Sequence, residues 1–124
     1  MVKIMIVDDA RLMRNIIKGI LLEELDCTVI EARDGAEAVE LYKEHSPDVV
    51  TMDVTMERQD GVQAAKDILS YDSRANILVV TSMGQEKLLK ECLEAGVRDF
   101  IIKPFSRDRI KTAVNRALTT SCRK

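Results

Sequence analysis

Five polar residues scattered along the chain form a set that could carry out phosphoryl-group chemistry. They are Asp8, Asp9, Asp53, Thr81 and Lys103. Three carboxylates brought together would raise one another's pKa values, and a divalent cation and a lysine ammonium would relieve their repulsion. Hard oxygen ligands suit Mg²⁺, a carboxylate can be the nucleophile that forms an aspartyl phosphate, and a threonine hydroxyl can donate to a phosphoryl oxygen. This chemistry requires a fold that brings the five residues to one place.

Short apolar runs end at, or just before, each of these polar residues. The runs cover residues 2–7, 48–53, 76–81 and 97–103, and a weaker one covers 27–32. They are too short for helices and rich in β-branched residues, which is typical of strands buried on both faces. The candidate residues are therefore expected at strand ends.

The segments between these strands have apolar residues at helical spacing. Helices are predicted over residues 11–25, 34–45, 62–71 and 85–95, and after residue 106. Asp34 and Ser106 are expected as N-caps, and Gly96 as a C-terminal stop. A five-fold alternation of strand and helix predicts an α/β fold, a parallel sheet with helices on both faces. In such sheets ligands bind outside the carboxyl ends of the strands, so the five residues should meet there.

Length and composition exclude several classes of protein. With 124 residues, the chain is expected to form one domain over residues 1–120 with a tail at 121–124. A formal net charge of −2 gives no general attraction to nucleic acids or anionic membranes. No apolar run approaches the roughly 20 residues of a membrane span. Three cysteines without metal-binding spacing indicate reduced thiols, and hence a cytoplasmic protein.

The order of Asp8-Asp9, Asp53, Thr81 and Lys103-Pro104 resembles the receiver domain of two-component response regulators. The closest type is the stand-alone, CheY-like chemotaxis regulator, and the resemblance covers the whole chain. It implies a flavodoxin-like, doubly wound sheet of five strands in the order 2-1-3-4-5, which the residue pattern alone does not supply. It also implies a phosphoprotein of signal transduction that takes a phosphoryl group from a histidine kinase. Its only catalysis would be of its own phosphotransfer and autodephosphorylation.

The resemblance also implies a role for each acidic residue. Asp53 would be the phosphorylation site. Asp9 and Asp53 would bind Mg²⁺ directly, together with the backbone carbonyl of Thr55, and Asp8 would act mainly through metal-bound water.

Other residues would couple phosphorylation to a binding surface. Thr81 and Lys103 would contact the phosphoryl group, and Phe100 would pack inward when Thr81 moves. The peptide bond before Pro104 would be cis, as some X–Pro bonds are. The surface that switches would comprise the fourth helix, the fifth strand and the fifth helix. Its partner would be an output protein such as a flagellar motor switch, and the chain would be a monomer.

The loop after Asp53 departs from the family pattern. Receivers usually have proline four residues after the phosphorylation site, where this chain has Glu57. A proline would fix φ there, and glutamate instead adds a carboxylate near the metal. In the family, the residues two past the phosphorylation site and two past the threonine influence hydrolysis. Here they are Thr55 and Met83, and neither is an acid or amide, so slow autodephosphorylation is expected.

Competing functions fit the residues less well. A Mg²⁺-dependent phosphatase with an aspartyl nucleophile would want an Asp-x-Asp pair, and Asp53-Val54-Thr55 lacks the second carboxylate. A nucleotide-binding module would need a glycine- or hydroxyl-rich loop after the first strand, where Asp8-Asp9 places negative charge. Asp8-Asp9 alone could also be a helix cap. A receiver domain cut from a transcriptional or sporulation regulator remains an alternative to the chemotaxis type.

Overall fold

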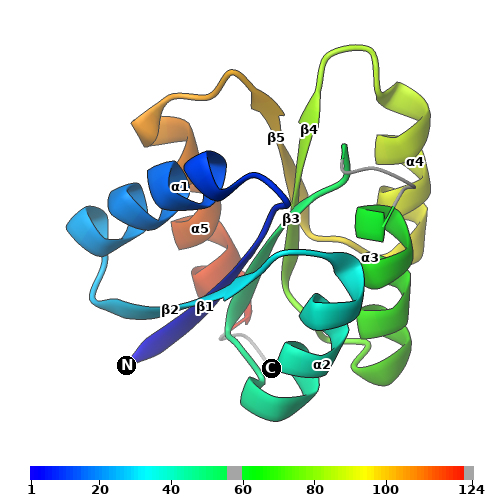
Figure 1. Ribbon diagram of the computed structural model, residues 1–124, viewed down its shortest axis with the longest axis horizontal. Helices are drawn as coiled ribbons and strands as arrows, with labels where there is room; N and C mark the ends of the chain where they lie inside the picture. Colours follow the sequence, from blue (N-terminus) through cyan, green and yellow to red (C-terminus); the bar gives the residue numbers. More distant parts are fainter. Residues whose placement is uncertain (56–59, 122–124) are drawn as a thin grey trace.

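Strands and helices alternate along the whole chain in the computed structural model, which describes residues 1–55 and 60–121 (Figure 1). The strands are β1 (Val2–Val7), β2 (Cys27–Ala32), β3 (Val49–Asp53), β4 (Ile77–Ser82) and β5 (Asp99–Lys103). The helices are α1 (Arg11–Glu24), α2 (Gly35–His45), α3 (Asp60–Tyr71), α4 (Glu86–Ala95) and α5 (Arg107–Ser121).

All neighbouring strands of the sheet pair in parallel, in the order β2-β1-β3-β4-β5. This confirms the expected α/β, flavodoxin-like sheet. The chain runs outward from β1 to β2 and then crosses back to β3, so the strand order reverses between β1 and β3. A reversal of this kind opens a crevice at the carboxyl ends of the two strands, where ligands bind in such folds.

The helices cover both faces of the sheet, with α1 and α5 on one face and α2, α3 and α4 on the other (Figure 1). Successive strand residues point to opposite faces. In β1, Ile4 and Ile6 pack toward α1 and α5, whereas Met5 and Val7 pack toward α2, α3 and α4. Because both faces are covered, every position of β3 is buried. This explains why the strands read as continuous apolar runs.

The predicted helix caps are confirmed. The Asp34 side chain accepts a hydrogen bond from the backbone N–H of Glu37 at 2.8 Å, and the Ser106 hydroxyl accepts one from that of Arg109 at 3.0 Å. Gly96 ends α4 in the left-handed conformation, at φ +116°. These caps satisfy backbone groups that a helix end would otherwise leave unpaired.

Two element boundaries differ from the prediction by two residues, and several others differ by one. The fifth strand was expected from Val97 but begins at Asp99, because the N–H of Val97 still bonds to the Cys92 carbonyl in the cap of α4. The third helix begins at Asp60, two residues before the expected Val62. The earlier start brings the backbone of this helix against the residue that ends β3.

Two cysteines of the described residues are free thiols in the core, as the prediction of reduced thiols requires. Cys27 and Cys92 are free and buried, one on each side of the sheet. Cys122 lies outside the described residues. Among residues 1–55 and 60–121, no helix has the length and apolar character needed to cross a bilayer.

Candidate functional site

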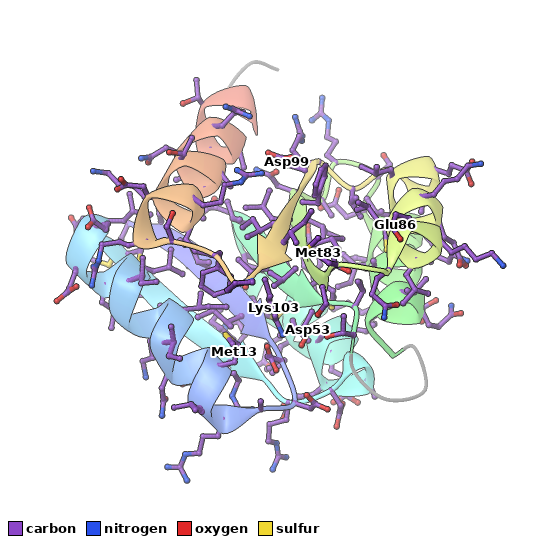
Figure 2. All side chains as sticks on the ribbon, turned by 90° about the horizontal axis from the view of Figure 1, so that it is seen from above. Met13, Asp53, Met83, Glu86, Asp99 and Lys103 are labelled. Atoms are coloured by element: carbon purple, nitrogen blue, oxygen red, sulfur yellow. The ribbon has the colours of Figure 1, made fainter. Side chains whose placement is uncertain are left out.

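The carboxyl ends of β1, β3, β4 and β5 bring the candidate residues to one edge of the sheet. Asp53 is the last residue of β3, Lys103 the last of β5, and Asp8 follows β1 directly. Seen from above that edge, Asp53 and Lys103 lie next to each other, with Met13 of α1 on one side and Met83 of the β4–α4 loop on the other (Figure 2). The fold thus joins residues that are far apart in sequence.

Both oxygens of the Asp53 carboxylate have partners. Lys103 Nζ donates to Asp53 Oδ2 at 3.2 Å. The backbone N–H and the hydroxyl of Thr55 both donate to Asp53 Oδ1, at 2.8 Å and 2.6 Å. The Asp53 residue is only 3% exposed, so these bonds act where water screens them little. A buried carboxylate fixed in this way and paired with an ammonium is held in one orientation, and a carboxylate so placed can act as a nucleophile.

Asp8 is a buried carboxylate rather than a helix cap, since the N-cap of α1 is Ala10. Its Oδ1 accepts from the N–H of Ala10 at 2.9 Å, and its Oδ2 is buried without a hydrogen-bond donor among the described residues. Lys103 Nζ lies 3.9 Å from that oxygen. Burial raises the pKa of Asp8 from 3.8 to about 6; the Asp53 charge adds to the rise, and the Ala10 bond and Lys103 oppose it.

The acidic cluster fits a hard divalent cation. Asp8, Asp9 and Asp53 each offer a carboxylate oxygen, and these oxygens lie within 4.8 Å of one another. The unpartnered Asp8 Oδ2 is a buried anionic oxygen of the kind that a cation or its bound water would satisfy. An all-oxygen donor set in an open site favours Mg²⁺ over softer metals.

Thr81 lies near the carboxyl end of β4, whereas Phe100 lies near the start of β5, and both are engaged in other contacts. Thr81 is 2% exposed, and its hydroxyl donates a long bond, 3.5 Å, to the carbonyl of Ser82. Phe100 is half-buried and packs against the core on the α2, α3 and α4 side. Its carbonyl accepts from Arg109 Nη2 of α5 at 2.6 Å. The peptide bond between Lys103 and Pro104 is cis, as the resemblance implied.

Two contacts of the site were not predicted from the sequence. The residue that departs from the family's usual proline is not among those that the structure describes. The Thr55 hydroxyl bonds to Asp53, and an Asp followed two residues later by a donor is the signature of an Asx turn that could have indicated it. Arg14 binds the backbone carbonyl of Asp8, and no local signal announces that contact. Glu57, the departure from the usual proline, lies outside the described residues.

Comparison with known proteins identifies the family. The model of the response regulator receiver domain matches residues 4–115. The chain belongs to the response regulator receiver domain family. It is 49% identical to the chemotaxis protein CheY of Bacillus subtilis, over 94% of this chain and 97% of that protein. It is 44% identical to the chemotaxis protein CheY of Thermotoga maritima, over 92% of this chain and 95% of that protein.

A solved structure of a longer relative has the same fold. The crystal structure of NtrX from Brucella abortus matches with a TM-score of 0.90 at 28% identity. The match covers 98% of this chain but only 28% of the NtrX chain. A receiver domain of this shape therefore occurs both in CheY proteins of similar length and inside a larger protein.

The raised pKa of Asp8 predicts a pH-dependent stability without divalent cations. Between the unfolded pKa of 3.8 and the folded value of about 6, the folded chain binds more protons than the unfolded chain. The contribution of Asp8 is therefore fully present below the lower value and is lost as pH rises through about 6. We expect the urea midpoint of the wild type, minus that of Asp8→Asn, to fall between pH 4.5 and pH 7 in EDTA. The fall should follow the interval between the two pKa values, from 3.8 to about 6. A difference that does not change with pH would contradict this assignment.

Proposed function

We propose that Asp53 accepts a phosphoryl group from the phosphohistidine of a histidine kinase, and that this modification switches a partner-binding surface. The observation that carries the proposal is the buried Asp53 carboxylate, with Lys103 Nζ at 3.2 Å and two more carboxylates beside it. Membership of the receiver family supports it.

The residues of the site have distinct roles in this transfer. One Asp53 oxygen forms the new O–P bond while the N–P bond of the phosphohistidine breaks, and its electron pair leaves on the histidine nitrogen. Lys103 balances negative charge on the transferred group, and the Thr81 hydroxyl can donate to one of its oxygens.

The acidic residues would hold Mg²⁺. Asp9, Asp53 and the backbone carbonyl of Thr55 would be its direct ligands, and Asp8 would act mainly through metal-bound water. When bound, Mg²⁺ supplies positive charge beside the phosphoryl oxygens. The chain's own contribution is to keep Asp53 buried and oriented until that charge is in place.

Phosphorylation would bias the surface formed by α4, β5 and α5. The new phosphoryl group carries a charge of roughly −1.5 to −2 beside Thr81. The long bond from Thr81 to the Ser82 carbonyl is readily exchanged for one to a phosphoryl oxygen, and Phe100 would then follow Thr81 inward. Moving a two-state element from 1:99 to 99:1 takes about 5.5 kcal/mol. A few charge-assisted hydrogen bonds can supply a good part of that free energy.

The relatives suggest a role in chemotaxis. Those that match over nearly the whole of both chains include chemotaxis proteins CheY of Bacillus subtilis and Thermotoga maritima. We therefore infer a cytoplasmic, monomeric regulator whose output partner is a flagellar motor switch, with no direct contact to nucleic acid or membrane. The alternative, a receiver acting within a transcriptional or sporulation regulator, is supported by the 39% identity to the transcriptional regulatory protein PdtaR of Mycobacterium tuberculosis, over 94% of this chain and 57% of that protein.

The phosphatase alternative gains no support from the site. A second carboxyl group two residues after the nucleophile would have to protonate the leaving group. That position holds Thr55, whose hydroxyl is already donated to Asp53. Catalysis is thus limited to the chain's own phosphotransfer and autodephosphorylation.

The proposal is tested by locating the phosphoryl group. The wild-type chain is incubated with acetyl phosphate and Mg²⁺, the acyl phosphate is reduced with borohydride, and the modified residue is identified by peptide mass spectrometry. We expect one phosphoryl group, on Asp53, and none when EDTA removes Mg²⁺. A phosphoryl group on another residue, or undiminished labelling in EDTA, would refute the proposal.

The residues at positions 55 and 83 predict a long-lived phosphoryl group. Thr55 is tied to Asp53, and Met83 is 80% exposed with no group that could hold an attacking water. A Thr55→Asn, Met83→Glu double variant should lose its label about tenfold faster, since one added hydrogen bond of about 1.4 kcal/mol in the transition state has that effect. The decay is followed after the donor is removed. Met83→Leu is the matched control, and an unchanged lifetime of the double variant would count against the assignment.

A further inference from the structure

Arg14 is a buried arginine directly beneath the acidic cluster. It lies on the inward face of α1 and is 8% exposed. Its Nη1 donates to the backbone carbonyl of Asp8 at 2.8 Å, and its Nε donates to Glu31 Oε1 of β2 at 3.0 Å. The other Glu31 oxygen accepts from Lys18 Nζ at 3.2 Å. The guanidinium therefore links the residue after β1 to the neighbouring strand.

These contacts fix Asp8 from several sides. Its N–H donates to the Ala32 carbonyl at 3.2 Å, its carbonyl accepts from Arg14, and its Oδ1 accepts from Ala10. Oδ2, the oxygen 3.9 Å from Lys103 Nζ, is the part of the residue left available to a ligand. The orientation of this oxygen thus depends on a backbone that Arg14 and β2 hold in place.

Stability alone does not account for an arginine at this position. The Arg14–Glu31 ion pair is only partly buried, with side-chain exposures of 10% and 30%, and a pair that water can reach typically contributes about 1 kcal/mol or less. The Arg14 hydrogen bond is the main cause that lowers the pKa of Glu31, with Lys18 adding to the effect. A charged pair retained beside three carboxylates points to a task at the site.

We propose that Arg14 is a positioning residue that, braced by Glu31, sets the turn between β1 and α1 and so presents Asp8 and Asp9 to Mg²⁺. This inference rests on the proposed function of the site. Groups that orient metal ligands without touching the metal commonly change metal affinity by 10- to 100-fold when they are removed. Arg14 acts through the backbone carbonyl of Asp8 and not through a side chain that binds the metal. We therefore expect a change in Mg²⁺ affinity at the lower end of that range.

The test compares Mg²⁺ binding among four variants. Arg14→Met keeps most of the apolar stem and removes both hydrogen bonds, and Arg14→Lys keeps the charge. Glu31→Gln weakens the interaction of residue 31 with Arg14. Lys18→Met is the matched control, because Lys18 contacts the same Glu31 but not Asp8. Affinity is measured by isothermal titration calorimetry on chains shown to be folded by circular dichroism.

We expect roughly tenfold weaker Mg²⁺ binding in Arg14→Met, an intermediate loss in Arg14→Lys and Glu31→Gln, and wild-type affinity in Lys18→Met. In acetyl phosphate labelling, the Mg²⁺ concentration for half-maximal rate should rise by the same factor in Arg14→Met, with little change in the rate at saturating Mg²⁺. A purely structural role would instead reduce the folded fraction without moving the Mg²⁺ midpoint.

Two results would overturn the inference alone: Mg²⁺ affinity in Arg14→Met equal to wild type, or an equal loss in Lys18→Met. If Arg14→Met does not fold, unchanged affinity in both Arg14→Lys and Glu31→Gln overturns it. A wild-type chain that binds no Mg²⁺ would overturn the proposed function as well.

Discussion

Replacing Asp53 with asparagine is expected to lower phosphoryl labelling by acetyl phosphate at least about hundredfold, a barrier increase of about 2.7 kcal/mol or more. An asparagine carbonyl can still accept from the N–H and hydroxyl of Thr55, so the loop is held. The carboxamide is uncharged and a much poorer nucleophile than the carboxylate. The loss therefore reports the missing nucleophile rather than a displaced backbone. Labelling is followed with radioactive acetyl phosphate and Mg²⁺.

The control for this variant is Asp48, the residue just before the opposite end of β3. Asp48 is exposed, and its carboxylate accepts from the backbone N–H of Lys3. Asp48→Asn should label like the wild type.

Asp53→Asn should also lower the pKa of Asp8, because the Asp53 charge is one cause of its rise. Carbon-13 NMR of the Asp8 carboxyl measures this shift. Undiminished labelling of Asp53→Asn would remove Asp53 from its assigned role.

Much of the fold could be predicted because its signals are local. Apolar runs and helical spacing located all the strands and helices, and the caps at Asp34, Gly96 and Ser106 depend on residues three or four positions apart. The order of the strands is not local, and it came from the family resemblance. The start of β5 was misplaced because Val97 is apolar and β-branched like a strand residue, yet its N–H belongs to the cap of α4.

The meeting of the candidate residues at one edge of the sheet could be predicted, but the contacts that hold them there could not. Carboxylates and a lysine at strand ends indicate their chemistry by type and place. Arg14 does not, because its partners are the backbone of Asp8 and the side chain of Glu31, and only packing of α1 on β2 brings these together. A charged residue within an amphipathic helix is usually solvated. Its burial, which no spacing rule supplies, is what distinguishes Arg14.

Gly61 lies in the first turn of α3, where the structure leaves no room for a side chain. A Cβ at this position would lie 2.2 Å from the carbonyl oxygen of Asp53 and 2.8 Å from the Cα of Val54. Both are backbone atoms. The N–H of Val54 donates to the Val80 carbonyl at 3.0 Å, so these atoms cannot move away without loss of that hydrogen bond. Only glycine lets α3 begin this close to the end of β3.

Gly61→Ala should therefore destabilise the chain by about 3 kcal/mol, the upper range for overpacking, and lower Tm by roughly 10 °C. Gly19→Ala is the matched control: Gly19 lies exposed within α1, and an added Cβ there meets nothing within 4 Å. That change should stabilise by up to about 1 kcal/mol, because alanine favours a helix. Both are measured by urea and thermal unfolding. Because the clash is with the residue that carries the proposed nucleophile, we expect a folded Gly61→Ala to hold Asp53 in a shifted position relative to Lys103. Its phosphorylation rate at saturating Mg²⁺ should fall even where the chain is fully folded. Equal stability of the two alanine variants would show that α3 and β3 separate freely, and would remove this constraint on the position of Asp53.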